Sequence, residues 1–124
     1  MFQSKTIVAA ILLFGSFSAV IADDDGEREL ERRFQEEVHP FLRAHCFGCH
    51  GEKKQEAKLD LTRYASIAAV RRDLGHWKIV LKRLEVKEMP PDDVKKQPAP
   101  SERQAVIDWI KTLQRHEAER SAGD

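Results

Sequence analysis

The sequence has little of several residue types, and each shortage excludes a class of protein. Its 21 lysines and arginines only balance its 21 aspartates and glutamates, whereas a domain that binds nucleic acid is expected to carry a basic excess. Aromatic residues make up 7% of the chain against 34% for charged residues, so few large side chains are available to fill a core. The alternation of apolar and polar residues that marks a β-strand is almost absent, which favours an all-α fold.

Charged residues are also missing from positions 6–22. Lys5 precedes this gap, an apolar run occupies positions 7–14, and small residues follow. We therefore expect a secretory signal peptide at residues 1–22, cleaved after its last residue, and export to the periplasm or an equivalent compartment. Residues 23–124 would form one domain with no stable membrane span. The alternative is an uncleaved anchor, because 17 uncharged residues approach the lower limit for a spanning helix.

There are only two cysteines, and they lie in the run Cys46-Phe47-Gly48-Cys49-His50. This spacing is the attachment motif of a c-type haem, in which each thiol bonds one vinyl group of the porphyrin and the histidine binds the iron. A thioredoxin-like motif would need a pattern of strands and helices, and a structural zinc site would need a second pair of ligands. A plain disulfide would leave the adjacent histidine unexplained. The motif therefore predicts one covalently attached haem c, with Cys46 and Cys49 as attachment points and His50 as the proximal ligand.

Met89 is the only methionine that would remain after removal of the signal peptide, and it directly precedes Pro90 and Pro91. The simplest alternative is that Met89 is a flexible core filler, as most methionines are. Because paired histidine and methionine ligands recur in haem proteins, we expect Met89 to be the distal iron ligand. A thioether favours the reduced iron, and a six-coordinate iron has no open position for a substrate. These properties favour transfer of single electrons over catalysis, so we expect an electron carrier with no catalytic residues.

Other residues could in principle take part in the same site. Four histidines could replace Met89, although an exposed or helix-terminal position is the commoner role for each: His39, His45, His76 and His116. Tyr64 and Trp77 could donate hydrogen bonds to a haem propionate, with packing on an amphipathic helix as the alternative. Lysines flank both the haem motif and Met89, but acidic residues alternate with them, so we expect a mixed, solvated surface.

The spacing of apolar residues predicts three to four helices packed around the haem. They are expected near residues 26–38, 61–70, 76–88 and 102–117. Pro40 should end or kink the first helix, and Pro90 and Pro91 should end the third. Ser101 with Gln104 has the pattern of a capping box that begins the last helix. Exposed loops are expected at residues 51–58 and 90–100.

The order of these motifs resembles the class I cytochrome c family. More narrowly, the run from His45 to Gly51, the segment from Lys54 to Leu61 and the run from Glu88 to Pro91 resemble the planctomycete-type cytochrome c domain. The resemblance extends over roughly Phe34 to Leu113. It implies an all-α, class I cytochrome c-like fold, with first and last helices that cross beside the haem.

The resemblance also implies the ligands, namely thioether bonds to Cys46 and Cys49 and iron ligation by His50 and Met89. In the family such a domain is commonly the leading module of a larger protein. Because this chain stops after its final helix, we expect a free-standing carrier that exchanges electrons with an unidentified redox partner protein. One alternative is a haem-bearing subunit of a particular dehydrogenase complex. Another is a haem-based sensor or peroxidase in which Met89 is off the iron.

Overall fold

The computed structural model describes residues 18–124, with side-chain surroundings from Asp24 onward. Most of the expected signal peptide, residues 1–22, therefore lies outside the described residues. Within residues 18–124 the regular structure is helical, apart from one isolated bridge between His50 and Gln55, which confirms the expected all-α fold. None of the helices in this part of the chain combines the length and the apolar character needed to cross a membrane.

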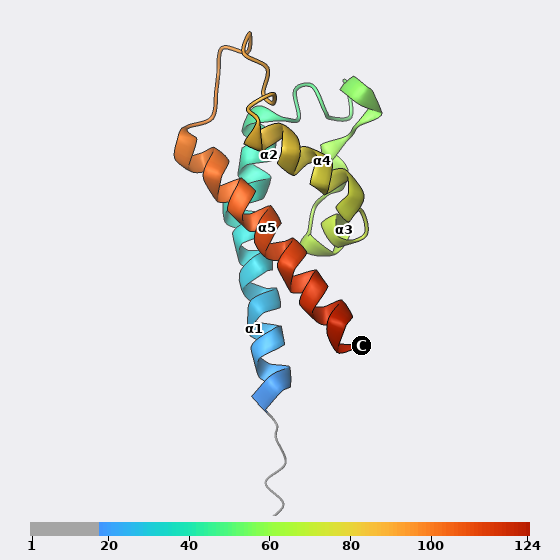
Figure 1. Cartoon of the computed structure of the whole chain (residues 1–124). Helices are drawn as coiled ribbons and strands as arrows, with labels where there is room; N and C mark the ends of the chain where they lie inside the picture. The colour runs from blue at the N-terminus through green and yellow to red at the C-terminus, as the bar shows by residue number, and fades with distance from the viewer. Residues whose placement is uncertain (1–17) are drawn as a thin grey trace, which may run out of the picture.

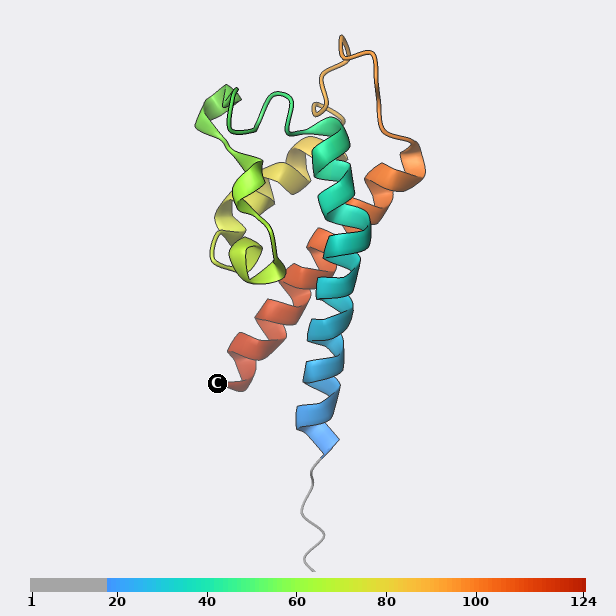
Figure 2. The same cartoon turned by 180° about the vertical axis from the view of Figure 1, so that it is seen from behind.

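The helices form two long crossing rods, with α3 and α4 in a smaller layer at their side (Figure 1). The elements are α1 (Ser18–Arg33), the π-helical η1 (Phe34–Val38), α2 (His39–His45), the 3₁₀ turns η2 (Glu56–Lys58) and η3 (Leu61–Arg63), α3 (Ile67–Arg71), α4 (Leu74–Glu85) and α5 (Pro100–Gly123). The elements α1, η1 and α2 form one column, and α5 crosses it in both views (Figures 1 and 2). Contacts of α5 with α1, η1 and α4 enclose the core.

The first column does not end at Pro40. A proline in a helix lacks an N–H and crowds the carbonyl four residues earlier. In η1 the N–H of His39 reaches back to the carbonyl of Phe34, five residues away, so the helix is already wider where Pro40 enters the first turn of α2. This π-turn is the local distortion by which the helix accommodates the proline. The helix consequently continues to His45, directly before the haem motif.

Most of the aromatic residues in the described part of the chain lie in the core. Trp109 of α5 is fully buried, and its ring centroid lies 5.3 Å from that of Phe34 and 5.9 Å from that of Trp77. Its Nε1 donates to the carbonyl of Leu30 at 2.9 Å, which fixes α5 against α1. The ring of Tyr64 packs edge-on against Trp77 at 5.4 Å. This row of rings links the first column, the last helix, α4 and the segment after η3.

Three expected element boundaries were wrong or incomplete. The helix α4 ends at Glu85, before the two prolines, and Lys87 closes it with a φ of 58°, a left-handed conformation common after helices. The last helix begins at Pro100, and the side chain of Glu102 accepts a 2.9 Å hydrogen bond from the N–H of Ala99, so Ser101 is not its cap. The expected helix at residues 61–70 is two short elements, η3 and α3.

Arg71 joins three helices at the end of the molecule where α5 finishes. From α3, its guanidinium donates to both carboxylate oxygens of Glu27 in α1, at 2.9 and 2.7 Å, and to Glu117 in α5 at 2.6 Å. The hydrogen bond from Arg71 lowers the pKa of Glu27 below its usual 4.5. Because the three side chains are only partly exposed, this network holds the side layer against the two long rods.

Candidate functional site

The cysteine motif forms a tight turn at the end of α2. The N–H groups of Cys46 and Phe47 both donate to the carbonyl of Leu42, at 2.8 and 2.9 Å, and the N–H groups of Cys49 and His50 both donate to the carbonyl of Cys46, at 3.2 and 2.8 Å. These bonds continue the helical path and bring both thiols and the imidazole to the wall of one cavity. The two thiols are free. Burial, and to a smaller extent the neighbouring Cys49, raises the pKa of the Cys46 thiol to about 12.

Gly51 is a residue of this turn to which composition and helical periodicity assign no role. It is buried, and a Cβ placed on it would overlap the backbone carbonyl oxygen of Phe47. The close approach lets the chain reverse directly after His50. The position of Gly51 immediately after the motif is the sequence signal that could have identified it.

The segment after the motif orients the imidazole of His50. Its Nδ1 lies 2.9 Å from the carbonyl oxygen of Glu56. A carbonyl can only accept, so Nδ1 carries the proton and the lone pair of Nε2 is left to bind a metal. The N–H of Glu56 in turn donates to the carbonyl of Cys49 at 2.9 Å, and Ala57 and Lys58 make the return with φ values of 56° and 57°. This loop was expected only to be exposed, and its role in holding His50 was missed.

Met89, in the segment after α4, lines the same cavity as the cysteine motif and a second cavity beside it. Two adjoining cavities of about 360 and 590 Å³ share four lining residues, namely Cys46, His50, Leu84 and Met89. The smaller one is lined mainly by apolar side chains, among them Phe41, Leu42, Leu59, Leu61 and Val80. The Met89 side chain is 38% exposed. All four residues singled out from the sequence line the larger cavity, namely Cys46, Cys49, His50 and Met89. They come from two segments about 40 positions apart.

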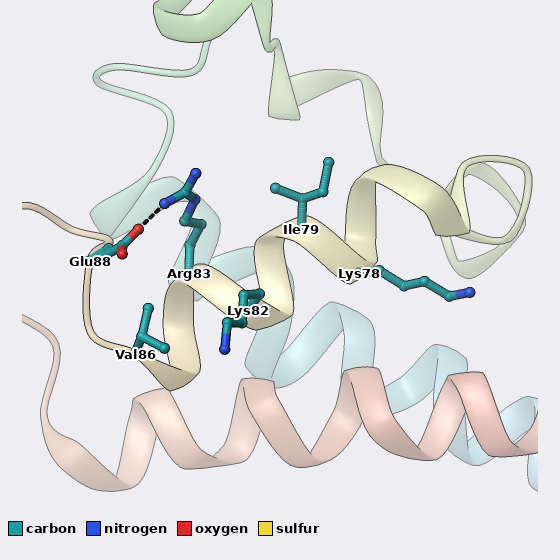
Figure 3. Close-up of a pocket in the computed structure, with 6 residues that line it drawn as sticks. All are labelled: Lys78, Ile79, Lys82, Arg83, Val86 and Glu88. Atoms are coloured by element: carbon teal, nitrogen blue, oxygen red, sulfur yellow. Dashed lines mark hydrogen bonds and ion pairs between the residues drawn. The ribbon is translucent and has the colours of Figure 1, made fainter.

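A third hollow, of about 410 Å³, runs along α4 beside the smaller cavity (Figure 3). It is lined by Lys78, Ile79, Lys82, Arg83, Val86 and Glu88. In Figure 3 the side chain of Arg83 reaches across to Glu88 and forms an ion pair with it. The N–H groups of Glu88 and Met89 also donate to the carbonyl of Arg83, at 3.0 and 3.4 Å. Arg83 thus ties the segment that carries Met89 back onto α4.

Two of the four other histidines line the cavities, and two do not. His45 has a buried side chain and lines the larger cavity, while His76 lines the smaller one with its Nδ1 2.6 Å from Asp73. His39 and His116 line neither cavity. His116 is not solvated as expected, because its side chain is only 14% exposed.

Tyr64 and Trp77 also line neither of these two cavities. The hydroxyl of Tyr64 donates to Asp73 at 2.5 Å, and burial together with this bond raises the pKa of Tyr64 to about 12. Trp77 is fully buried against the rings of Tyr64 and Trp109. The hydroxyl of Tyr64 thus has a partner within the fold, whereas the Nε1 of Trp77 is buried without a hydrogen-bond partner among the described residues.

The donor set and the lining fit a haem. Two thiols on one turn can form the two thioether bonds, a correctly protonated imidazole faces the cavity, and a soft thioether lies across it. The apolar side chains around the smaller cavity match the apolar faces of a porphyrin.

Comparison with known proteins agrees with this assignment. The family model described as Planctomycete cytochrome C matches residues 46–93, a span that begins at the first cysteine of the motif and includes Met89. No curated protein and no solved structure gives a significant match. The expected resemblance is thereby confirmed for this segment, and it supports a haem-binding electron-transfer protein.

Proposed function

We propose that this planctomycete-type cytochrome c domain transfers single electrons through one covalently attached haem c, with His50 and Met89 as the two axial ligands. The observation that carries the proposal is the shared lining of the two cavities. Cys46 and His50 border both of them from the end of α2, and Met89 borders both from the segment after α4. The end of α2 and the segment after α4 are therefore enough to bring the proposed donors together.

Each residue has a distinct part in this function. Cys46 and Cys49 would form the thioether bonds, which makes the cofactor permanent. His50 would bind through Nε2, because Glu56 holds the proton on Nδ1, and a hydrogen bond of this kind makes the imidazole a better donor. When bound, the haem supplies the iron that gains and loses one electron.

Met89 and the apolar lining would set the balance between the two redox states. A neutral thioether stabilises the reduced iron relative to a second imidazole. Leu42, Leu59 and Leu61 line the smaller cavity and would keep water from a bound haem, and a low dielectric disfavours the state with the higher charge. Both effects raise the reduction potential. With the sixth position filled by Met89, the protein itself would not act as an enzyme.

The partner and the place of action follow from the N-terminal composition and the position of the site. We propose that the chain is exported, because a charged start and an uncharged apolar run precede the domain. A redox partner protein would approach the rim of the cavities, where Met89 is partly exposed. A dedicated dehydrogenase would be recognised by its stable association with the purified holoprotein, and a diffusible carrier by the lack of such a complex.

Covalent attachment is the test of this proposal. We expect the purified protein to keep its haem under denaturing conditions and to give a c-type pyridine haemochrome spectrum. Cys49→Ala should lose one thioether bond, which shifts that spectrum, and the Cys46→Ala, Cys49→Ala double variant should hold no covalent haem. Absence of covalent haem from the native protein would refute the proposal. Rapid binding of carbon monoxide to the reduced native protein would instead favour a sensor.

A further inference from the structure

Arg103 of α5 contacts the backbone of the segment that carries Met89. Its Nη1 donates to the carbonyl oxygen of Met89 at 2.6 Å and lies 3.4 Å from the carbonyl oxygen of Leu84. Leu84 and Met89 are both lining residues of the two cavities. The half-buried Arg103 therefore contacts the backbone of two lining residues and joins the end of α4 to the segment that follows it.

The other backbone hydrogen bond of Met89 is made to α4 and involves only its N–H group. The N–H of Met89 donates to the carbonyl of Arg83 at 3.4 Å, near the upper limit for a hydrogen bond. The 2.6 Å bond from Arg103 is short, as expected when the donor is charged. Among the described residues, Arg103 is the only side chain that anchors the carbonyl side of Met89.

The guanidinium of Arg103 also carries a charge that has no acidic partner among the described residues. Within residues 24–124, no carboxylate lies within ion-pair distance of it. An unpaired, half-buried cation beside the cavities favours whichever state of a bound redox centre has the lower positive charge.

We propose that Arg103 is a positioning residue that keeps the thioether of Met89 on the iron and raises the reduction potential of the centre. The proposal rests on the proposed ligation by Met89. The hydrogen bonds fix the backbone of Met89 relative to α5, so the segment that carries its side chain cannot move away from the cavity without breaking a charge-assisted bond. The fixed charge stabilises the reduced, less positive iron.

The test measures how easily an external ligand displaces Met89 from the ferric holoprotein. Arg103→Met keeps most of the side-chain volume but removes the donors and the charge. Loss of a hydrogen bond to a charged group, about 1.5–3 kcal/mol, corresponds to roughly a 10- to 100-fold rise in imidazole affinity. The reduction potential should fall in the same variant. Arg103→Lys, which keeps the charge and one donor, should restore most of both properties.

Arg115→Met is the matched control. Arg115 lies on the same helix, is exposed, and donates only to Thr112 at 3.4 Å. Its replacement should change neither imidazole affinity nor potential. If Arg103→Met behaves like this control, the proposal is overturned. A purely structural role would lower thermal stability and leave the potential of the folded holoprotein unchanged, which would also overturn it.

Met89→Ala separates this proposal from the ligation on which it rests. If Met89→Ala binds imidazole strongly and Arg103→Met does not, only the role of Arg103 fails. If Met89→Ala binds imidazole no better than the native protein, the distal ligand has been wrongly assigned and both fail. Should Arg103→Met not yield a folded holoprotein, Arg103→Gln decides, because it keeps a donor without the charge. Arg103→Gln should then lower the reduction potential, and a native reduction potential in this variant would refute the role of the charge.

Discussion

At the scale of single residues, His50 and Met89 are each held through a backbone carbonyl. The carbonyl of Glu56 accepts from the imidazole of His50, while the carbonyl of Met89 itself accepts from Arg103. One contact fixes a side chain directly, and the other fixes the backbone from which the side chain extends. The two iron ligands of the proposed site thus depend on contacts with residues that are not themselves candidate ligands.

Replacement of Met89 tests the distal ligand. Met89→Ala should lower the reduction potential by on the order of 0.1 V, a modest part of the roughly 0.8 V that axial ligands span, because water or a nitrogen base replaces a soft thioether. It should also let carbon monoxide bind rapidly to the reduced protein. Val94→Ala is a suitable control, since Val94 lines the larger cavity but is no candidate ligand. An unchanged potential in Met89→Ala would place the sixth ligand elsewhere.

Gly51 offers a test of the turn that carries the motif. Gly51→Ala should lower the free energy of unfolding of the holoprotein by about 1–3 kcal/mol, because the added methyl group meets the carbonyl of Phe47. Denaturant titration measures this change. Gly75→Ala is the control, because a Cβ at Gly75 in α4 meets nothing within 4 Å and alanine favours a helix. Equal stability of the two variants would show that Gly51 has no steric role.

At the scale of helices, the Arg71 network links the fold to pH. Hydrogen bonding to Arg71 lowers the pKa of Glu27 from its usual 4.5, so the carboxylate form is the one that the folded state prefers. Its contribution to stability is complete above pH 4.5 and is lost as the pH falls through the lowered pKa. Stability should therefore decline on acidification over this range.

Glu27→Gln should remove this part of the pH dependence. We expect it to reduce stability by about 1 kcal/mol at pH 7, a modest value because the paired groups are partly exposed to solvent. The difference from the native protein should shrink towards pH 3. Thermal unfolding at several pH values measures both effects. Glu119→Gln, an exposed change near the end of α5, should leave the pH profile as it is. A constant difference at all pH values would contradict the assignment.

At the scale of the whole molecule, local patterns predicted the helices and singled out four residues that line one cavity, but they did not predict what holds those residues. The apolar positions Leu61, Tyr64, Ile67 and Val70 are all buried, as their spacing indicated. Hydrogen bonds to backbone carbonyls have no sequence signature. The partnerships of Glu56 with His50 and of Arg103 with Met89 could not be predicted, because they depend on how distant segments meet.

Two of the differences from the expectation involve a proline. Proline rules describe an isolated helix, and here neighbouring turns absorb the proline or end the helix first. The π-turn of η1 accommodates Pro40, and the left-handed Lys87 ends α4 before Pro90 is reached. In both places the backbone conformation before the proline sets the course of the helix.

The unbroken course of the first column through Pro40 has a mechanical consequence. From Ser18 to His45 the chain is helical throughout, which at about 1.5 Å per residue gives a rod roughly 40 Å long. The cysteine motif begins at one end of this rod, and the start of the described chain lies at the other (Figure 1). The rod acts as a stiff spacer, so the end that carries the cysteine motif stands off from residue 23, the expected start of the mature domain, at a set distance and in a set direction.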